Sequence, residues 1–121
     1  ISYIHAESFP AGEMKHGPIA LLENEFPVIT FANKNDPLYK KNVSSIQEAK
    51  ARGAFIIVVA DHISSELQEH ADAILIVPEV KDFIQPIMNV IPLQLLAYYV
   101  ALARECDIDQ PRNLAKSVTV E

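Results

Sequence analysis

Two side chains near opposite ends of the chain have the residue types and settings that covalent or acid–base chemistry could use. The first is Lys116, which lies between Ala115 and Val118 in the closing stretch RNLAKSVTVE. Apolar neighbours lower the pKa of a lysine by disfavouring its charged form, and the neutral amine can attack a carbonyl carbon to form a Schiff base. The alternative, which spacing alone favours, is a lysine that buries its stem and keeps its ammonium in water.

The second is His16, in the stretch AGEMKHGPIALLE at residues 11–23. Lys15 precedes the histidine and a Gly-Pro pair follows it, so the imidazole stands at a constrained turn, where it could transfer a proton near neutral pH. A plain surface turn is the alternative. A metal site made of His5, Glu7 and His16 matches no zinc spacing, and we expect no metal.

Other polar residues have simpler interpretations. Asp36 precedes a proline and is typical of a helix cap, and Asp61 follows a predicted strand and is typical of a turn. Cys106 has no histidine beside it that would activate a nucleophile. Neither GxxxxGK[ST] nor GxGxxG occurs, so a nucleotide site has no support and we expect no cofactor.

The elements that must position these residues follow from the apolar pattern. Three runs rich in β-branched residues lie at 27–32, 54–60 and 73–78, and they lack alternation, which is typical of parallel strands buried on both faces. A helix is predicted between the first two runs, from Asp36 to a stop at Gly53, and the crossover should be right-handed.

A shorter helix should follow the second strand, with Ser65 and Gln68 spaced as a capping box. The stretch 83–104 is helical and apolar almost all round, with Pro86 and Pro92 marking a bend, and we expect it to be central. These elements predict an α/β domain with helices over a mostly parallel sheet, a layering like that of flavodoxin.

Composition limits the possible partners. The 121 residues are half hydrophobic and carry a net charge of −6, which argues against nucleic acid and against anionic membranes. The single cysteine cannot form an internal disulfide, so we expect a cytoplasmic protein. The uncharged run 87–103 contains Asn89 and Gln94, so a buried helix explains it better than a membrane span.

Three longer stretches are similar to one enzyme family. ISYIHAESFPAGEMKHGPIALL, VIPLQLLAYYVALA and DIDQPRNLAKSVTVE closely resemble the carboxyl-terminal end of the glucosamine-6-phosphate synthases, the isomerizing glutamine:fructose-6-phosphate aminotransferases. The resemblance runs through essentially the whole chain. It implies a sugar isomerase (SIS) domain, a three-layer α/β sandwich, in the pathway toward UDP-N-acetylglucosamine.

The resemblance also implies roles for three residues. Lys116 is similar to the lysine that forms a Schiff base with fructose 6-phosphate and helps open its ring. Ala115 is similar to the tail position whose backbone contacts the sugar. His16 is similar to the histidine that assists ring opening and reaches the sugar site of a neighbouring subunit, so the resemblance implies a homodimer. The product of the family is glucosamine 6-phosphate.

Other parts of the family pattern are absent. The glutamate that moves the proton between C1 and C2 would stand just before Ile1, and the glutaminase domain and the first SIS lobe are missing. We therefore expect residues 1–121 to be one SIS domain, the second lobe, incomplete at its start, with 106–121 as the active-site tail. We expect this lobe to be inactive alone.

Two further functions are kept as alternatives. A regulatory SIS module would bind a sugar phosphate reversibly without a reacting lysine, and a structural lobe would only associate subunits. A Lys116→Ala change would abolish synthesis in the enzyme, spare binding in the regulator and have no effect in the structural lobe.

Overall fold

A computed structural model of the protein describes residues 1–113, and Lys116 and Ala115 lie outside the described part. The described chain forms two compact units, one of Glu7–Pro92 and the other of Ile1–Ala6 together with the chain from Leu93. In chain order the elements are η1 (Ala11–His16), η2 (Pro18–Leu21), β1 (Pro27–Phe31), α1 (Tyr39–Lys50), β2 (Phe55–Ala60), α2 (Ser65–His70), β3 (Ala73–Ile76) and α3 (Gln85–Ala103).

The three strands form one parallel sheet in the order β1-β2-β3. Val28 pairs with Ile56, and Val58 pairs with Ile74, so partners in register share a face of the sheet. This arrangement confirms the α/β fold class with a parallel sheet, because each strand is joined to the next by a helix, as parallel pairing requires.

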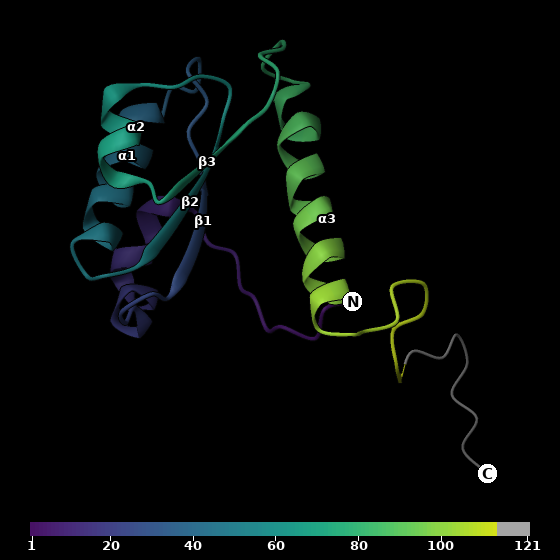
Figure 1. Ribbon diagram of the computed structural model, residues 1–121. Coiled ribbons are helices and arrows are strands. Elements are labelled where there is room, and N and C mark those ends of the chain that lie inside the picture. The colour runs from purple at the N-terminus through teal and green to yellow at the C-terminus, as the bar shows by residue number, and fades with distance from the viewer. Residues whose placement is uncertain (114–121) are drawn as a thin grey trace. The chain divides into compact units, whose positions relative to one another are not determined.

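Helices α1 and α2 lie side by side over one face of the sheet (Figure 1). Their apolar side chains and those of the strands form the hydrophobic core. Its buried members include Val43, Ile46 and Ala49 from α1, Leu67 from α2, and Ile56, Val58 and Ala60 from β2. The helical spacing on α1 places its three members on one stripe, which explains why this polar helix packs.

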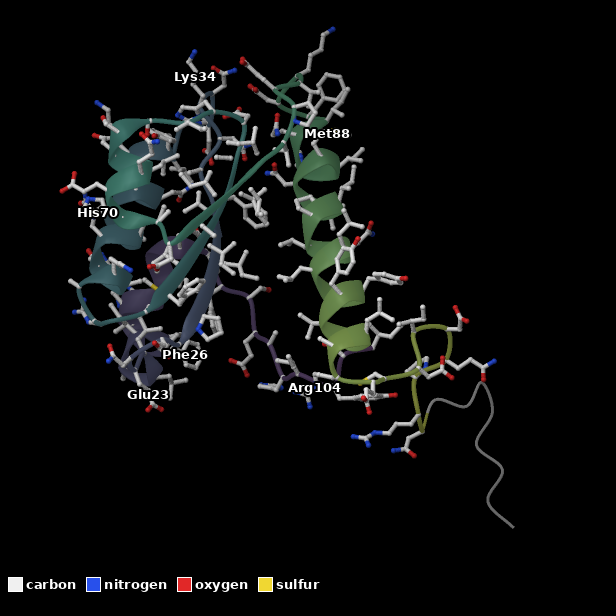
Figure 2. The ribbon with its side chains drawn as sticks, viewed as in Figure 1. Glu23, Phe26, Lys34, His70, Met88 and Arg104 are labelled. Atoms are coloured by element: carbon white, nitrogen blue, oxygen red, sulfur yellow. The ribbon has the colours of Figure 1, made fainter. Side chains whose placement is uncertain are left out.

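The opposite face of the sheet is less covered than the strand pattern predicts. Ile29, Phe31 and Phe55 are 40%, 39% and 42% exposed, whereas Val59 on the same face is 0% exposed, so the expected burial is complete on one face and only partial on the other. Figure 2 shows the two ends of the sheet, with Lys34 beyond the carboxyl ends of the strands and Phe26 at the amino end of β1.

The helix starts differ slightly from the predicted ones. The N-cap of α1 is Leu38, and Asp36 instead caps the turn before the helix, where its Oδ1 accepts a 2.7 Å hydrogen bond from the Leu38 N–H. In α2 the N-cap is Ser64, whose Oγ accepts from the Leu67 N–H at 3.2 Å, so the predicted capping box at Ser65 was wrong by one residue. A hydroxyl on the last extended residue reaches the N–H three residues on, which is what a cap requires.

Helix α3 is one continuous helix that contains Pro92 inside it, where a bend was predicted. By length and composition this helix could cross a membrane, and the core helix of a soluble protein can have the same length and composition. Among the described residues, 6% of its most apolar stretch is buried. It was expected to be central, yet Ile87, Leu95 and Tyr99 are 59%, 52% and 63% exposed.

Candidate functional site

The aspartate that follows β2 is a structural residue of the loops at the carboxyl end of the sheet. The side chain of Asp61 is 3% exposed, and its Oδ1 accepts a 2.8 Å hydrogen bond from the Lys34 N–H. The same oxygen lies 2.9 Å from Nδ1 of His62. Asp61 therefore ties the loop after β1 to the loop after β2, which agrees with its interpretation as a turn residue.

A set of three amide side chains fixes the start of α3 to the same edge of the sheet. Asn33, which is 8% exposed, and Asn89 exchange two hydrogen bonds of 3.3 and 2.7 Å. Gln85 donates to Oδ1 of Asn89 at 3.2 Å and accepts from the Val80 N–H at 3.2 Å. Every polar atom in this set has a partner, as buried amides require.

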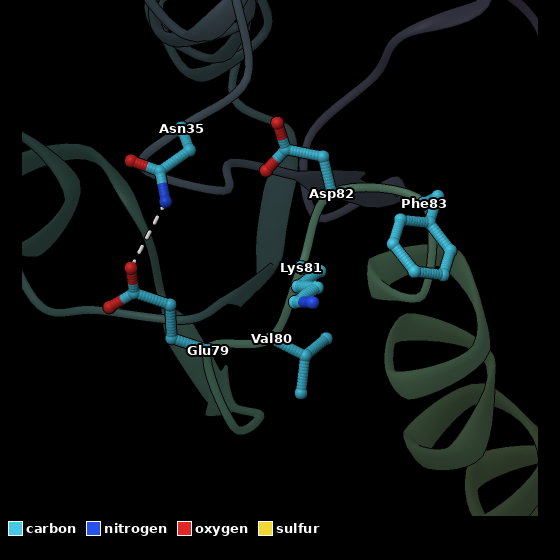
Figure 3. A pocket seen from close by; sticks show the side chains of 6 residues that line it. All are labelled: Asn35, Glu79, Val80, Lys81, Asp82 and Phe83. Carbon is cyan, nitrogen blue, oxygen red and sulfur yellow. Dashed lines mark hydrogen bonds between the residues drawn. The ribbon is translucent and has the colours of Figure 1, made fainter.

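An open hollow of about 720 Å³ lies next to this edge, lined by Asn35, Glu79, Val80, Lys81, Asp82 and Phe83. Figure 3 shows the Asn35 amide directed at the Glu79 carboxylate, with a hydrogen bond of 3.0 Å, and the Phe83 ring on the other side. The lining mixes one ammonium, two carboxylates and a phenyl ring. None of these groups has the setting of an activated nucleophile.

His16 is the one predicted site residue that the structure describes. It ends η1, and its side chain is exposed. The short helix is fixed to the body of the unit in two ways: Met14 packs against the hydrophobic core, and Ser45 Oγ donates a 3.3 Å hydrogen bond to the Ala11 carbonyl. The element is therefore held in place while the imidazole stays accessible, which suits a residue that serves a site completed by other segments.

The segment that leads to Lys116 is built in the other unit. Helix α3 ends in a Schellman motif: the Cys106 N–H donates to the Ala101 carbonyl at 2.9 Å, and the Glu105 N–H donates to the Leu102 carbonyl at 3.0 Å. Glu105 has a φ of 54°, a left-handed value usually taken by glycine at this position. Two backbone hydrogen bonds thus cap the helix end.

Two further contacts shape this segment, residues 104–113, which we call the tail base. Asp107 Oδ1 accepts hydrogen bonds from the N–H groups of Asp109 at 2.8 Å and Gln110 at 3.1 Å. Tyr3 then meets Arg112: the Arg112 N–H donates to the tyrosine Oη at 2.6 Å, and the guanidinium carbon lies 4.2 Å from the ring centroid. The sequence offered no signal for this pair, because its members are 109 positions apart.

The described residues form no metal site and no activated nucleophile from the candidates that the sequence offered. Among residues 1–113 no group of three or more His, Cys, Asp or Glu side chains could hold a metal ion. Cys106 is half-buried, and its Sγ lies 3.7 Å from the Arg104 carbonyl oxygen, so the thiol contacts no base. The chemistry that the sequence predicts therefore rests on His16 and on Lys116.

Comparison with protein families gives a match over most of the chain. A family model described as the SIS domain matches residues 1–104. Among solved structures, the C-terminal domain of glucosamine-fructose-6-phosphate aminotransferase from Francisella tularensis superposes with a TM-score of 0.78 at 39% identity, and the match covers 91% of this chain and 31% of that one.

Several curated proteins named glutamine–fructose-6-phosphate aminotransferase [isomerizing] are similar along all 121 residues. The protein of Methanosarcina acetivorans is 54% identical, that of Thermus thermophilus 55% and that of Gloeobacter violaceus 58%. The match covers 100% of this chain and 19 to 20% of those proteins. The chain therefore spans about one fifth of the length of the relatives it matches.

Proposed function

Because the chain belongs to the SIS domain family, we propose that it is the carboxyl-terminal part of an isomerizing glutamine–fructose-6-phosphate aminotransferase. The full-length protein would convert fructose 6-phosphate and glutamine into glucosamine 6-phosphate and glutamate. The observation that carries this proposal is an identity of 54% or more over all 121 residues to relatives with that name, which includes the tail with Lys116. This part would contribute sugar ring opening and isomerisation.

The central group of the proposed mechanism is the amine of Lys116. In its neutral form the Nζ atom adds to the C2 carbonyl carbon of open-chain fructose 6-phosphate, and loss of water leaves an iminium linkage. Ammonia from glutamine hydrolysis would then add to C2 and displace Nζ, which frees the lysine amine and leaves an imine of ammonia at C2. This imine withdraws electrons from C1, so a base can remove a proton there and return it to C2. Ala115 would bind the sugar through its backbone, next to the reacting lysine.

His16 would supply the proton transfer that opens the sugar ring. An imidazole can protonate the ring oxygen and accept a proton from the hydroxyl at C2, because both of its forms are populated near neutral pH. The exposure of His16 at the end of a fixed short helix supports this role. The sugar it serves would be the one bound at the neighbouring subunit of a homodimer.

The proposed organisation follows from the family. Residues 1–121 would form one SIS domain, the second lobe of the isomerase part, with 106–121 as the tail that folds over the active site. The glutaminase domain, the first SIS lobe and the proton-moving glutamate would come from the rest of a cytoplasmic protein. The hydrogen bonds between Asn33 and Asn89 support the view that the start of α3 belongs to the same folded unit as the sheet.

The test is reductive trapping on the full-length protein. Fructose 6-phosphate and borohydride should give a sugar adduct on the peptide with Lys116, and Lys116→Arg should reduce both the adduct and synthesis by about 100-fold or more, since the nucleophile is lost. Lys81→Arg is the matched control, because Lys81 lines the hollow beside the sheet and should leave the adduct unchanged.

The other outcomes separate the alternatives. Saturable binding of fructose 6-phosphate with no adduct at Lys116 would contradict the enzyme and indicate a regulatory module. Absence of both binding and adduct would indicate a structural lobe that only associates subunits.

A further inference from the structure

The amino-terminal segment contacts the chain just before its reactive tail, and this contact belongs to one compact unit. We propose that Tyr3 is a positioning residue for Lys116: it holds Arg112, four residues before the lysine, at the tail base. The proposal rests on the proposed function of Lys116 and adds to it a residue that touches neither the sugar nor the lysine.

The contact uses two different groups of each partner. The tyrosine Oη accepts a hydrogen bond of 2.6 Å from the main-chain N–H of Arg112, and the tyrosine ring lies under the guanidinium at 4.2 Å. The first interaction is independent of the arginine side chain, and the second is independent of the tyrosine hydroxyl. Each can therefore be removed without the other.

The backbone of Tyr3 supports the view that its position is specified. Its φ is 55°, in the left-handed region that an aromatic residue rarely adopts. Such a conformation is strained and persists only where surrounding contacts determine it, and such residues cluster at functional sites. The contacts that Tyr3 makes with Arg112 are of this kind.

Chain geometry makes a fixed Arg112 relevant to Lys116. Four residues span at most about 14 Å when fully extended, so an anchor at Arg112 sets an upper limit of about 14 Å on the distance between the Cα atoms of Arg112 and Lys116. The Schellman motif and the Asp107 turn fix the preceding residues, and the contact with Tyr3 completes the anchor. Ordering the tail base before the sugar binds removes part of the entropy cost of bringing amine and carbonyl together.

The experiment uses three variants of the full-length protein. Tyr3→Phe removes the hydroxyl and keeps the ring, Arg112→Gln removes the guanidinium and keeps the main-chain N–H, and Arg112→Lys restores a cation over the ring. The first readout is the rate of borohydride-trapped adduct formation at Lys116. The second is hydrogen exchange of the Arg112 amide, which reports its bond to Tyr3 directly.

Tyr3→Phe should slow adduct formation about 3- to 10-fold, the range expected for one lost hydrogen bond, and should speed exchange of the Arg112 amide by a similar factor. Arg112→Gln should slow adduct formation about 2- to 5-fold, with recovery in Arg112→Lys. We expect kcat to fall while KM for fructose 6-phosphate stays within about twofold, since the contact with Tyr3 does not bind the sugar.

Tyr99→Phe is the matched control, because Tyr99 lies in the same unit, is 63% exposed and pairs only edge-on with Tyr98 among the described residues. Faster exchange of the Arg112 amide with unchanged trapping would overturn the positioning role. An absent adduct in the unchanged protein would contradict the proposed function instead. In that case hydrogen exchange of the Arg112 amide still tests the contact between Tyr3 and Arg112. An exchange rate that is unchanged in Tyr3→Phe would show that the tyrosine hydroxyl does not bind this amide.

Discussion

The exposed side chain of His16 lies at the end of the short helix η1. Met14 packs this helix against the hydrophobic core, and the Ser45 hydroxyl donates a hydrogen bond to its Ala11 carbonyl. The side chain is therefore exposed while the element that carries it is fixed. The opening of a sugar ring needs one proton delivered and one removed, and a single imidazole can do both in turn.

His16→Asn should slow synthesis from fructose 6-phosphate by about 100-fold, the lower end of the range for general acid–base groups. The defect should disappear with 5-deoxyfructose 6-phosphate, an analogue that lacks the hydroxyl needed to close the ring. His70→Asn is the control, since the polar partners of that ring among the described residues are Gln47 and Glu69. Equal loss with both sugars would place His16 in a later step.

Sequence patterns identified some roles of single residues and missed others, for physical reasons. Asp61 was interpreted as a turn residue, and the hydrogen bond from the Lys34 N–H agrees with that role. Asp36 was interpreted as the helix cap, but the N-cap is Leu38 and Asp36 accepts the Leu38 N–H in the turn before the helix. The contact of Tyr3 with Arg112 could not be predicted, because nothing local to either residue specifies a partner so distant in sequence.

At the scale of the elements, one ion pair joins the end of α1 to the strands. Lys50 Nζ lies 2.6 and 2.7 Å from the two oxygens of Asp72, and Asp72 Oδ2 also accepts from the Ile56 N–H at 2.7 Å. The hydrogen bonds from Lys50 and then from Ile56 hold the pKa of Asp72 below its ordinary value of 3.8. The carboxylate is thus favoured more in the folded state than in the unfolded one.

The sign of the pH dependence follows from this lowered pKa. The contribution of Asp72 to stability is present above about pH 3.8 and is lost as the pH falls through the lower, folded value. Asp72→Asn should lower the thermal unfolding midpoint of the chain at pH 7, and the difference from the unchanged chain should shrink below pH 3.8. A difference that stays constant down to pH 2 would contradict the assignment.

The elements themselves were largely predictable. Runs of β-branched residues identified all three strands of the sheet, because strands buried against helices need unbroken apolar side chains. The capping error at α2 arose because Ser64 and Ser65 are adjacent and only backbone geometry decides which is the N-cap. The short helices η1 and η2 were read as a turn, since their few residues carry no periodic pattern.

At the scale of the whole molecule, apolar side chains remain exposed on α3 and on one face of the sheet. Patches of this kind in a natural protein mark surfaces that other segments or chains cover. The relatives that the chain matches are about five times longer, which agrees with this reading. Sequence composition alone could not distinguish a helix buried by its own chain from one covered by further parts.

We therefore expect that the purified 121-residue chain neither hydrolyses glutamine nor forms glucosamine 6-phosphate, whereas the full-length protein does both. Coupled assays of glutamate and of the amino sugar measure the two activities separately. The unchanged full-length protein is the positive control, and its Lys116→Arg variant should keep glutamine hydrolysis while it loses synthesis. Turnover by the short chain would show that the proposed division of the site is wrong.

The contact between Tyr3 and Arg112 closes a loop of 109 positions, and loop closure has a cost of its own. For a flexible chain of that length the entropy term is about 4 kcal/mol, more than a hydrogen bond and a cation–π contact return. The loop can close only because the intervening residues are already folded and their ends are brought within reach. The contact between Tyr3 and Arg112 therefore reports whether the chain between the two residues is folded, because an unfolded chain would lose it.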